Sequence, residues 1–161
     1  ERLITAFANL PQRSHYELWI AGPADSRFLP DLIAQIEQLH LTAQVKFLNY
    51  VSYDELPRLI NQAIALVFPS LWEGFGLPVL EAMACGTPVI TSQVSSLPEV
   101  AGTAALLIDP YQVAAITDAM QAVANDAGLA TQLRDRSLSQ ASRFSWAKTG
   151  TATAAVIQKY L

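Results

Sequence analysis

The chain has little cysteine, little histidine and little charge for its length. Its 161 residues contain one cysteine, Cys85, and two histidines, His15 and His40. A single cysteine excludes an internal disulfide and a cysteine-rich metal cluster, and two histidines so far apart argue against a histidine-based zinc site. We therefore expect no bound metal and a protein that works in the reducing cytoplasm.

Charged residues make up 15% of the chain, and its formal net charge is −4. A negative domain is poorly suited to neutralising the phosphates of a nucleic acid, so we expect no nucleic-acid partner. No uninterrupted run of about 20 apolar residues occurs, so the sequence predicts no transmembrane segment. Peripheral membrane association of a full-length protein stays open. Hydrophobic residues make up 52% of the chain, which is enough for a substantial buried core.

The first residues, Glu1-Arg2-Leu3-Ile4, include neither an initiator methionine nor the basic and apolar regions of a signal peptide. We interpret residues 1–161 as one domain cut from a longer chain.

Short apolar runs alternate with helix-like segments along most of the sequence. The expected strands are 17–21, 45–48, 65–69, 89–91 and 104–108. The expected helices are 2–10, 28–39, 53–61 behind a Ser52–Glu55 capping box, 78–85, a single turn at 97–100, 113–124, 129–144, and a last helix capped by Ser145 that runs to Leu161. Strands separated by helices form right-handed crossovers and a parallel sheet covered on both faces. The sequence therefore predicts a doubly wound parallel α/β fold with a helical C-terminal segment.

The opening helix is unusual, because domains of this class normally begin with a strand. Either the first strand was removed with the upstream residues, or the segment 2–10 is not helical.

The most informative stretch runs from Phe68 to Ala82, where a strand ends, a glycine-containing loop follows and a helix begins at Pro78. In an open α/β sheet, ligands bind outside the carboxyl ends of the strands. Glycine lets the backbone come close to a ligand, and the free N–H groups at a helix start suit a phosphate. We therefore predict a phosphate cradle formed by Gly74, Phe75, Gly76 and Leu77.

Two glutamates flank this cradle, Glu73 before it and Glu81 in the first turn of the helix. Ionised glutamate accepts hydrogen bonds, and a vicinal diol supplies two donors at a suitable spacing. The pattern predicts two sugar rings joined by a diphosphate, which is a nucleotide sugar. On spacing alone, a structural role for the same residues is equally good, with glycines in a turn and a glutamate favoured near a helix N-terminus. A dinucleotide fingerprint would need glycine in place of Val79, and no G-x-x-x-x-G-K-[ST] motif occurs.

The segment Glu73–Ile90 contains an E-x7-E pair followed by A-x-G-x-P-V, and Ser95–Val100 and Ala104–Pro110 continue the pattern. In these residues the chain resembles the retaining, GT-B-fold glycosyltransferases of family 4, also called glycosyl transferases group 1. The resemblance extends from about Leu18 to Pro110.

The resemblance implies that Glu81 binds the ribose hydroxyls of the nucleotide and that Glu73 is the catalytic residue, in contact with the donor sugar near the reacting carbon. Backbone amides around Phe75, Gly76 and Leu77 would meet the sugar hydroxyls and the diphosphate. The implied reaction moves a sugar from a UDP-, GDP- or ADP-sugar to an acceptor hydroxyl with retention of anomeric configuration. It implies no metal or other cofactor, and no Asp-x-Asp occurs here.

Departures from the family pattern limit what the chain is expected to do alone. Family members usually carry Arg-x4-Lys just before the opening helix, and Arg2 has no lysine at that spacing. Asn49 stands where the family often has glycine, although asparagine tolerates a left-handed backbone. The N-terminal GT-B domain, which supplies the acceptor site, is absent, so we expect an inactive chain that binds donor weakly. The alternatives are a non-catalytic GT-B-like binding or scaffold module and, third, an epimerase or phosphorylase of the same fold.

Three further side chains have simpler expected roles. Cys85, at the end of an apolar helix, should be a small buried thiol rather than a nucleophile. Trp72 either lines the donor site or packs beneath the loop. Trp146 is expected to anchor the last helix to the body of the domain.

Overall fold

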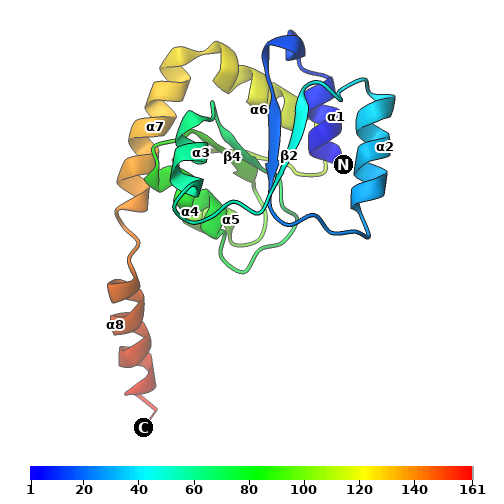
Figure 1. Cartoon of the computed structure of the whole chain (residues 1–161). Coiled ribbons are helices and arrows are strands. Elements are labelled where there is room, and N and C mark those ends of the chain that lie inside the picture. Colours follow the sequence, from blue (N-terminus) through cyan, green and yellow to red (C-terminus); the bar gives the residue numbers. More distant parts are fainter. Residues whose placement is uncertain (161) are drawn as a thin grey trace.

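The computed structural model describes residues 1–160, and parallel strands form its centre (Figure 1). Within these residues the strands are β1 (Leu18–Ala21), β2 (Val45–Asn49), β3 (Leu66–Phe68), β4 (Val89–Ser92) and β5 (Ala105–Ile108). Hydrogen bonds group them into two sheets, one of β1 and β2 and one with the order β3-β4-β5. Leu18 is in register with Val45, while Leu66 and Ala105 both pair with Val89.

Helices precede, connect and follow the strands. They are α1 (Arg2–Ala8), the 3-10 helix η1 (Arg13–His15), α2 (Leu29–Gln38), α3 (Leu56–Gln62), α4 (Leu77–Ala84), α5 (Leu97–Ala101), α6 (Val113–Asn125), α7 (Ala127–Ala141) and α8 (Trp146–Ile157). Each crossover between paired strands contains a helix: α2 joins β1 to β2, α4 joins β3 to β4, and α5 joins β4 to β5. The predicted doubly wound α/β class is confirmed, and its strands fall into two hydrogen-bonded groups.

The central strand β4 is covered on both faces, and all four of its residues are buried. Val89 belongs to a cluster with Val79 and Met83 of α4, whereas its neighbour Ile90 belongs to a cluster with Ile116 of α6. Because successive strand side chains point to opposite faces, α4 and α6 lie on opposite sides of the sheet. The loop between β3 and α4 directly follows β3, so it lies at the carboxyl end of the strands.

The opening segment is helical, as predicted. In α1, Ile4, Ala6, Phe7 and Ala8 are buried. Ala6 contributes to the same cluster as Ile90 and Ile116, so α1 covers the same face of the sheet as α6.

The capping box expected at Ser52 is wrong. The Ser52 hydroxyl donates to the Glu55 carboxylate at 2.7 Å instead of accepting from the backbone, and residues 53–55 form a turn. The helix therefore begins at Leu56, with Pro57 in its first turn. Proline is tolerated there because its missing N–H is not needed in the first turn.

The last helix begins where the sequence predicts, but it is not anchored to the domain as predicted. The Ser145 side chain accepts a hydrogen bond from the Lys148 N–H at 3.2 Å and caps α8. Trp146 is 82% exposed, so the expectation that it anchors this helix is wrong. Figure 1 shows the reason, because α8 extends away from the sheets and their covering helices. Leu161, the expected end of the helix, lies outside the described residues.

Candidate functional site

The candidate site is built on residues 69–76, which we call the Glu73 loop, between β3 and α4. The loop ends at Gly76, which caps α4 with a left-handed backbone (φ 108°, ψ 48°). Its carbonyl accepts from the N–H groups of Val79 and Leu80 at 3.0 and 3.2 Å. Glycine is required here for a second reason, since a Cβ on Gly76 would lie 2.7 Å from the Cδ2 atom of the fully buried Leu97. The start of α4 is therefore pressed against α5.

Two serines before α5, Ser95 and Ser96, hold the Glu73 loop by hydroxyl-to-backbone hydrogen bonds. Ser95 Oγ accepts from the Glu73 N–H at 3.1 Å and donates to the Glu73 carbonyl at 2.8 Å. Ser96 Oγ lies 2.9 Å from the carbonyl oxygens of both Glu73 and Phe75. Ser95 has a left-handed backbone, with φ 61°, which is uncommon for a residue with a side chain. We call these two residues the serine pair.

The backbone N–H groups of four consecutive residues have no acceptor within residues 1–160. They belong to Gly74, Phe75, Gly76 and Leu77. Their neighbours are paired: the Glu73 N–H donates to Ser95, and the Val79 N–H donates to Gly76. Unpaired donors at a helix start form a binding site for an anion, favoured by the positive end of the helix dipole. These are the four residues that the sequence predicts as a phosphate cradle.

The two glutamates of the predicted site are half-buried, and neither carboxylate forms a hydrogen bond or ion pair with another residue in 1–160. Glu73 lies in the loop and Glu81 lies on α4, so the structure sets them on either side of the free N–H groups without direct hydrogen bonding between them. Glu81 is the fifth residue of α4 and not, as expected, in its first turn, because the helix starts at Leu77. Both carboxylates keep their full acceptor capacity for a ligand.

Two aromatic residues of the Glu73 loop, Trp72 and Phe75, have different surroundings. Trp72 is 78% exposed, so the alternative that it packs beneath the loop is wrong. The Phe75 ring meets the Phe144 ring edge to face, with centroids 5.9 Å apart and planes at 83°. Phe144 follows α7, so the C-terminal segment contacts the candidate site.

Cys85, the residue after α4, is half-buried. Burial raises the pKa of its thiol, and the nearby negative charge of Glu81 raises it further. A raised pKa lowers the thiolate fraction at neutral pH, which agrees with the expectation that Cys85 is not a nucleophile.

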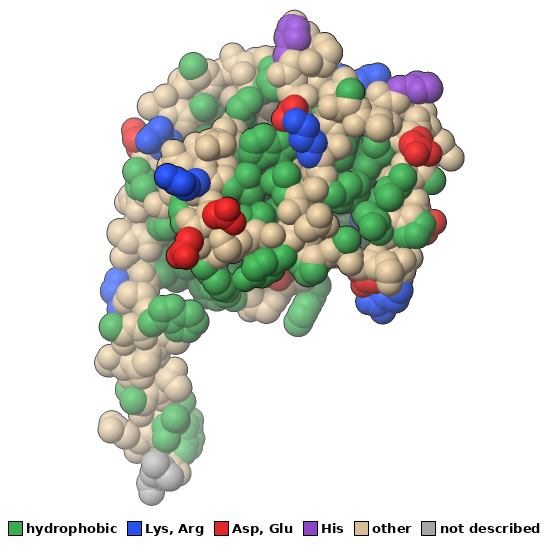
Figure 2. All heavy atoms as spheres, in the orientation of Figure 1, with side chains coloured by type: hydrophobic (Ala, Val, Ile, Leu, Met, Phe, Trp, Pro, Cys, Tyr) green, Lys and Arg blue, Asp and Glu red, His purple; other side chains and the backbone are tan. Residues whose placement is uncertain are grey.

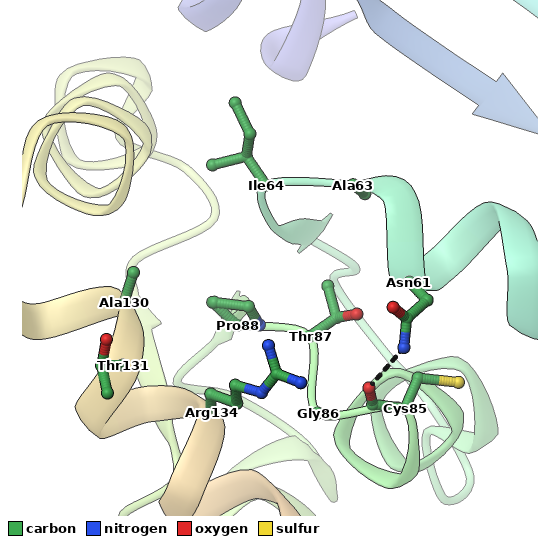
Figure 3. A pocket seen from close by; sticks show the side chains of 10 residues that line it. All are labelled: Asn61, Ala63, Ile64, Cys85, Gly86, Thr87, Pro88, Ala130, Thr131 and Arg134. Carbon is green, nitrogen blue, oxygen red and sulfur yellow. Dashed lines mark hydrogen bonds between the residues drawn. The ribbon is translucent and has the colours of Figure 1, made fainter. Parts of the chain in front are cut away.

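A cavity of about 260 Å³ lies near the amino ends of the strands, whereas the Glu73 loop lies at their carboxyl ends (Figure 3). It is bordered by Ala63 and Ile64 before β3, by Gly86-Thr87-Pro88 before β4, and by Arg134 of α7. The Asn61 side chain donates to the Cys85 carbonyl at its rim, at 3.0 Å. Because these residues precede the strands, the cavity is separate from the Glu73 loop.

Among residues 1–160, no cluster of three or more His, Cys, Asp or Glu side chains is placed to hold a metal ion. Within the same range, no helix has the length and apolar character needed to cross a bilayer.

Sequence reasoning missed the serine pair and Phe144. The serines reach the loop across 21 to 23 positions of sequence, and Phe144 meets Phe75 from 69 positions away (144 minus 75). No local spacing could have indicated either contact.

Residues 1–140 match the family model described as glycosyl transferases group 1. The chain belongs to the glycosyl transferases group 1 family. The family model covers the Glu73 loop, the serine pair and Glu81 and extends through nearly all of α7, whereas Phe144 lies beyond the match.

Individual relatives agree with this membership. The group 1 chain is 39% identical over 154 residues to O-antigen chain mannosyltransferase B of Escherichia coli, covering 94% of this chain and 40% of the relative. The structure of sucrose-phosphate synthase from Thermosynechococcus elongatus superposes with a TM-score of 0.87 and 26% identity, covering 99% of this chain and 41% of that one. Anabaena HepE, solved with UDP and glucose, superposes with a TM-score of 0.89 and 23% identity, covering 98% of this chain and 44% of that one.

The group 1 chain has the fold of one part of each of these two structures. It spans about two fifths of the length of the relatives that it matches.

Proposed function

We propose that this group 1 chain is the donor-binding half of a retaining GT-B glycosyltransferase of family 4. The whole protein would transfer a sugar from a UDP-, GDP- or ADP-sugar to an acceptor hydroxyl, with the anomeric configuration retained. The N-terminal GT-B domain of the same full-length chain would supply the acceptor site, and we expect the enzyme to act in the cytoplasm without a metal.

One observation carries this proposal: two carboxylates without a partner in residues 1–160 flank four consecutive N–H groups that also have none there, at the carboxyl end of β3. The N–H groups of Gly74–Leu77 are donors for the diphosphate, and the carboxylates are acceptors for sugar hydroxyls on each side of it. A structural role for the same residues explains the Gly76 turn, yet it leaves both carboxylates and all four donors without partners among the described residues.

The chemistry follows from the same geometry. The leaving group is a nucleoside diphosphate, and negative charge develops on its oxygens as the bond to the sugar breaks. N–H groups oriented in advance by the serine pair stabilise that charge without reorganising. Glu73, next to the cradle, is assigned to the donor sugar at the reacting carbon, and Glu81, one turn along α4, to the ribose hydroxyls.

The names of the matched proteins support the choice of a nucleotide sugar. HepE was solved with UDP and glucose, and the Escherichia coli relative is a mannosyltransferase. A scaffold module would need neither glutamate, so substitutions distinguish the two hypotheses.

The test uses the full-length protein with UDP-, GDP- and ADP-sugars as donors. Replacing Glu81 with Gln should raise the donor KM roughly 10- to 100-fold, because a charge-assisted hydrogen bond contributes about 1.5–3 kcal/mol. Replacing Glu73 with Gln should lower kcat at least about 100-fold, which is typical for loss of a group that stabilises the transition state. Glu37, an exposed glutamate of α2, is the matched control, and Glu37→Gln should leave both constants unchanged.

An unchanged donor KM in Glu81→Gln would remove the ribose assignment. Turnover of none of the three donors by the unsubstituted protein would favour the scaffold module. An NMR spectrum that shows inversion at the anomeric carbon of the product would refute the retaining mechanism alone.

We also expect the chain alone to be inactive and to bind donor weakly, since Arg2, at the start of α1, is not followed by a lysine at the Arg-x4-Lys spacing. Submicromolar affinity for UDP-glucose, measured by calorimetry on residues 1–161, would overturn that expectation.

A further inference from the structure

The segment that carries the candidate site has no cationic side chain. No lysine, arginine or histidine occurs between Arg58 and Arg134, and this stretch includes the Glu73 loop, α4 and α5. Figure 2 shows Lys and Arg side chains lying singly on that face of residues 1–160, without a basic patch. Attraction of this segment for an anion therefore comes mainly from its backbone N–H groups. Because a hydrogen bond weakens steeply when the N–H points away from the acceptor, the directions of these groups decide how well they bind a diphosphate.

Peptide geometry fixes two of these directions. No cis peptide bond occurs within residues 1–160, and in a planar trans peptide the N–H points opposite to the carbonyl. The Glu73 carbonyl shares its peptide with the Gly74 N–H, and the Phe75 carbonyl shares its peptide with the Gly76 N–H. Both carbonyls accept hydrogen bonds from the serine pair. The Gly74 and Gly76 N–H groups therefore point away from the serine pair.

The two hydroxyls hold different peptides. Ser95 Oγ bonds both backbone groups of Glu73, at 3.1 Å from its nitrogen and 2.8 Å from its carbonyl oxygen, so it fixes the backbone from which the Glu73 side chain starts. A serine hydroxyl has one hydrogen to donate. Because the Glu73 carbonyl already receives the Ser95 hydrogen, the Ser96 hydrogen is available to the Phe75 carbonyl, 2.9 Å away. Ser95 thus holds the peptide that follows Glu73, and Ser96 holds the peptide that follows Phe75.

We propose that Ser95 and Ser96 are positioning residues for sugar transfer, each acting on a different part of the cradle. Ser95 fixes the backbone of Glu73 and directs the Gly74 N–H toward the diphosphate. Ser96 directs the Gly76 N–H toward the same group. This assignment rests on the proposed function, and it adds two residues that need not touch the reacting atoms.

Steady-state kinetics on the full-length protein test the assignment. Ser95→Ala should lower kcat roughly 10-fold, because it loosens the residue assigned to the reacting carbon. Ser96→Ala should raise the donor KM and the inhibition constant of the released nucleoside diphosphate by roughly 10-fold, with a smaller effect on kcat. Ser96→Thr keeps the hydroxyl on a helical backbone (φ −79°, ψ −12°), so it should keep both constants near those of the unsubstituted protein.

Ser137→Ala is the matched control for a loss of stability. The Ser137 hydroxyl also donates to a backbone carbonyl far along the chain, that of Ala104 at 3.3 Å. Ala104 precedes β5, so this contact lies at the amino end of the strand, away from the Glu73 loop. Ser137→Ala should lower the midpoint of urea denaturation without changing kcat or KM. If the serine pair contributed to stability alone, its alanine variants would behave in the same way.

Glycine amide signals give a readout that does not depend on turnover. In the full-length protein, labelled at its glycine nitrogens for NMR, the released nucleoside diphosphate should shift the signals of Gly74 and Gly76. Ser96→Ala should reduce the Gly76 shift more than the Gly74 shift, and Ser95→Ala should do the reverse.

Two results would overturn the proposal while the proposed function stands. The first is a protein that transfers sugar and whose Ser95→Ala and Ser96→Ala variants have unchanged kinetic constants. The second is an equal loss of the Gly74 and Gly76 shifts in both variants. If the unsubstituted protein transfers sugar from none of the three donors, the proposed function fails, and this assignment fails with it.

Discussion

Replacing Gly76 with alanine tests the contact between the Glu73 loop and α5. Gly76 has φ 108°, and a Cβ there would lie 2.7 Å from Leu97 Cδ2. Leu97 is fully buried, so its side chain cannot turn toward solvent. A left-handed conformation costs a residue with a side chain about 1–2 kcal/mol. Overpacking a core contact typically costs about 1–3 kcal/mol. We therefore expect Gly76→Ala to lower the free energy of unfolding by about 2–5 kcal/mol.

Gly74 provides the matched control two positions away in the same loop. A Cβ on Gly74 would meet no atom within 4 Å, and the backbone is not left-handed. Gly74→Ala should be neutral or stabilise by about 0.4–1 kcal/mol, because alanine restricts the unfolded chain.

Urea denaturation followed by circular dichroism measures both variants. With a slope of about 1–3 kcal/mol per molar urea, Gly76→Ala should lower the midpoint by roughly 1 M or more relative to Gly74→Ala. Equal midpoints would refute the reasoning, because the close contact and the left-handed backbone would then have no energetic consequence.

Three smaller predictions follow from local contacts. Asp126→Ala removes the side-chain cap of α7 and should lower stability by about 1 kcal/mol in the same urea assay; an unchanged midpoint would contradict this. Cys85 should react with iodoacetamide at pH 8 more slowly than a free thiol, and Glu81→Gln should speed the reaction, because the pKa of Cys85 is raised by burial and by that charge. Lys46→Met should raise the lowered pKa of Glu17 toward its ordinary value in an NMR titration, because the Lys46 hydrogen bond is the largest cause of the shift. Because the pKa of Glu17 is lower in the folded chain than in the unfolded chain, its interaction with Lys46 stabilises the fold at a pH above the unfolded-state pKa. That contribution is lost as the pH falls through the folded-state pKa.

The sequence predicted the fold class because its signals are local and strong. Apolar runs bounded by Gly22-Pro23 and by Asp109-Pro110 mark strand ends, and the N-cap at Ser145 was found from one side chain and its position. Asn49 was expected to tolerate a left-handed turn, and its φ of 54° confirms it. Each of these depends on a residue's own conformational preference.

Other features depend on partners that spacing does not reveal. Ser52 and Glu55 have the capping-box spacing, but their side chains bond to each other, and sequence does not show which acceptor a hydroxyl will use. Trp146 has the size of a core residue, yet among residues 1–160 nothing covers its side chain, because α8 extends away from the sheets. The serine pair acts on the Glu73 loop through tertiary contacts, so its role became visible only in the folded chain.

Electrostatics connects the candidate site to the expected weakness of the chain alone. The Glu73 loop offers a diphosphate four N–H groups and no side-chain cation, and hydrogen bonds to a charged group contribute about 1.5–3 kcal/mol each. Repulsion from a carboxylate 4 Å away would oppose them by about 1 kcal/mol in water and about 4 kcal/mol at an effective dielectric constant of 20. Glu73 and Glu81 flank the same cradle, and the formal net charge is −4, so much of the attraction is offset. Two cations close to the cradle would reverse that balance.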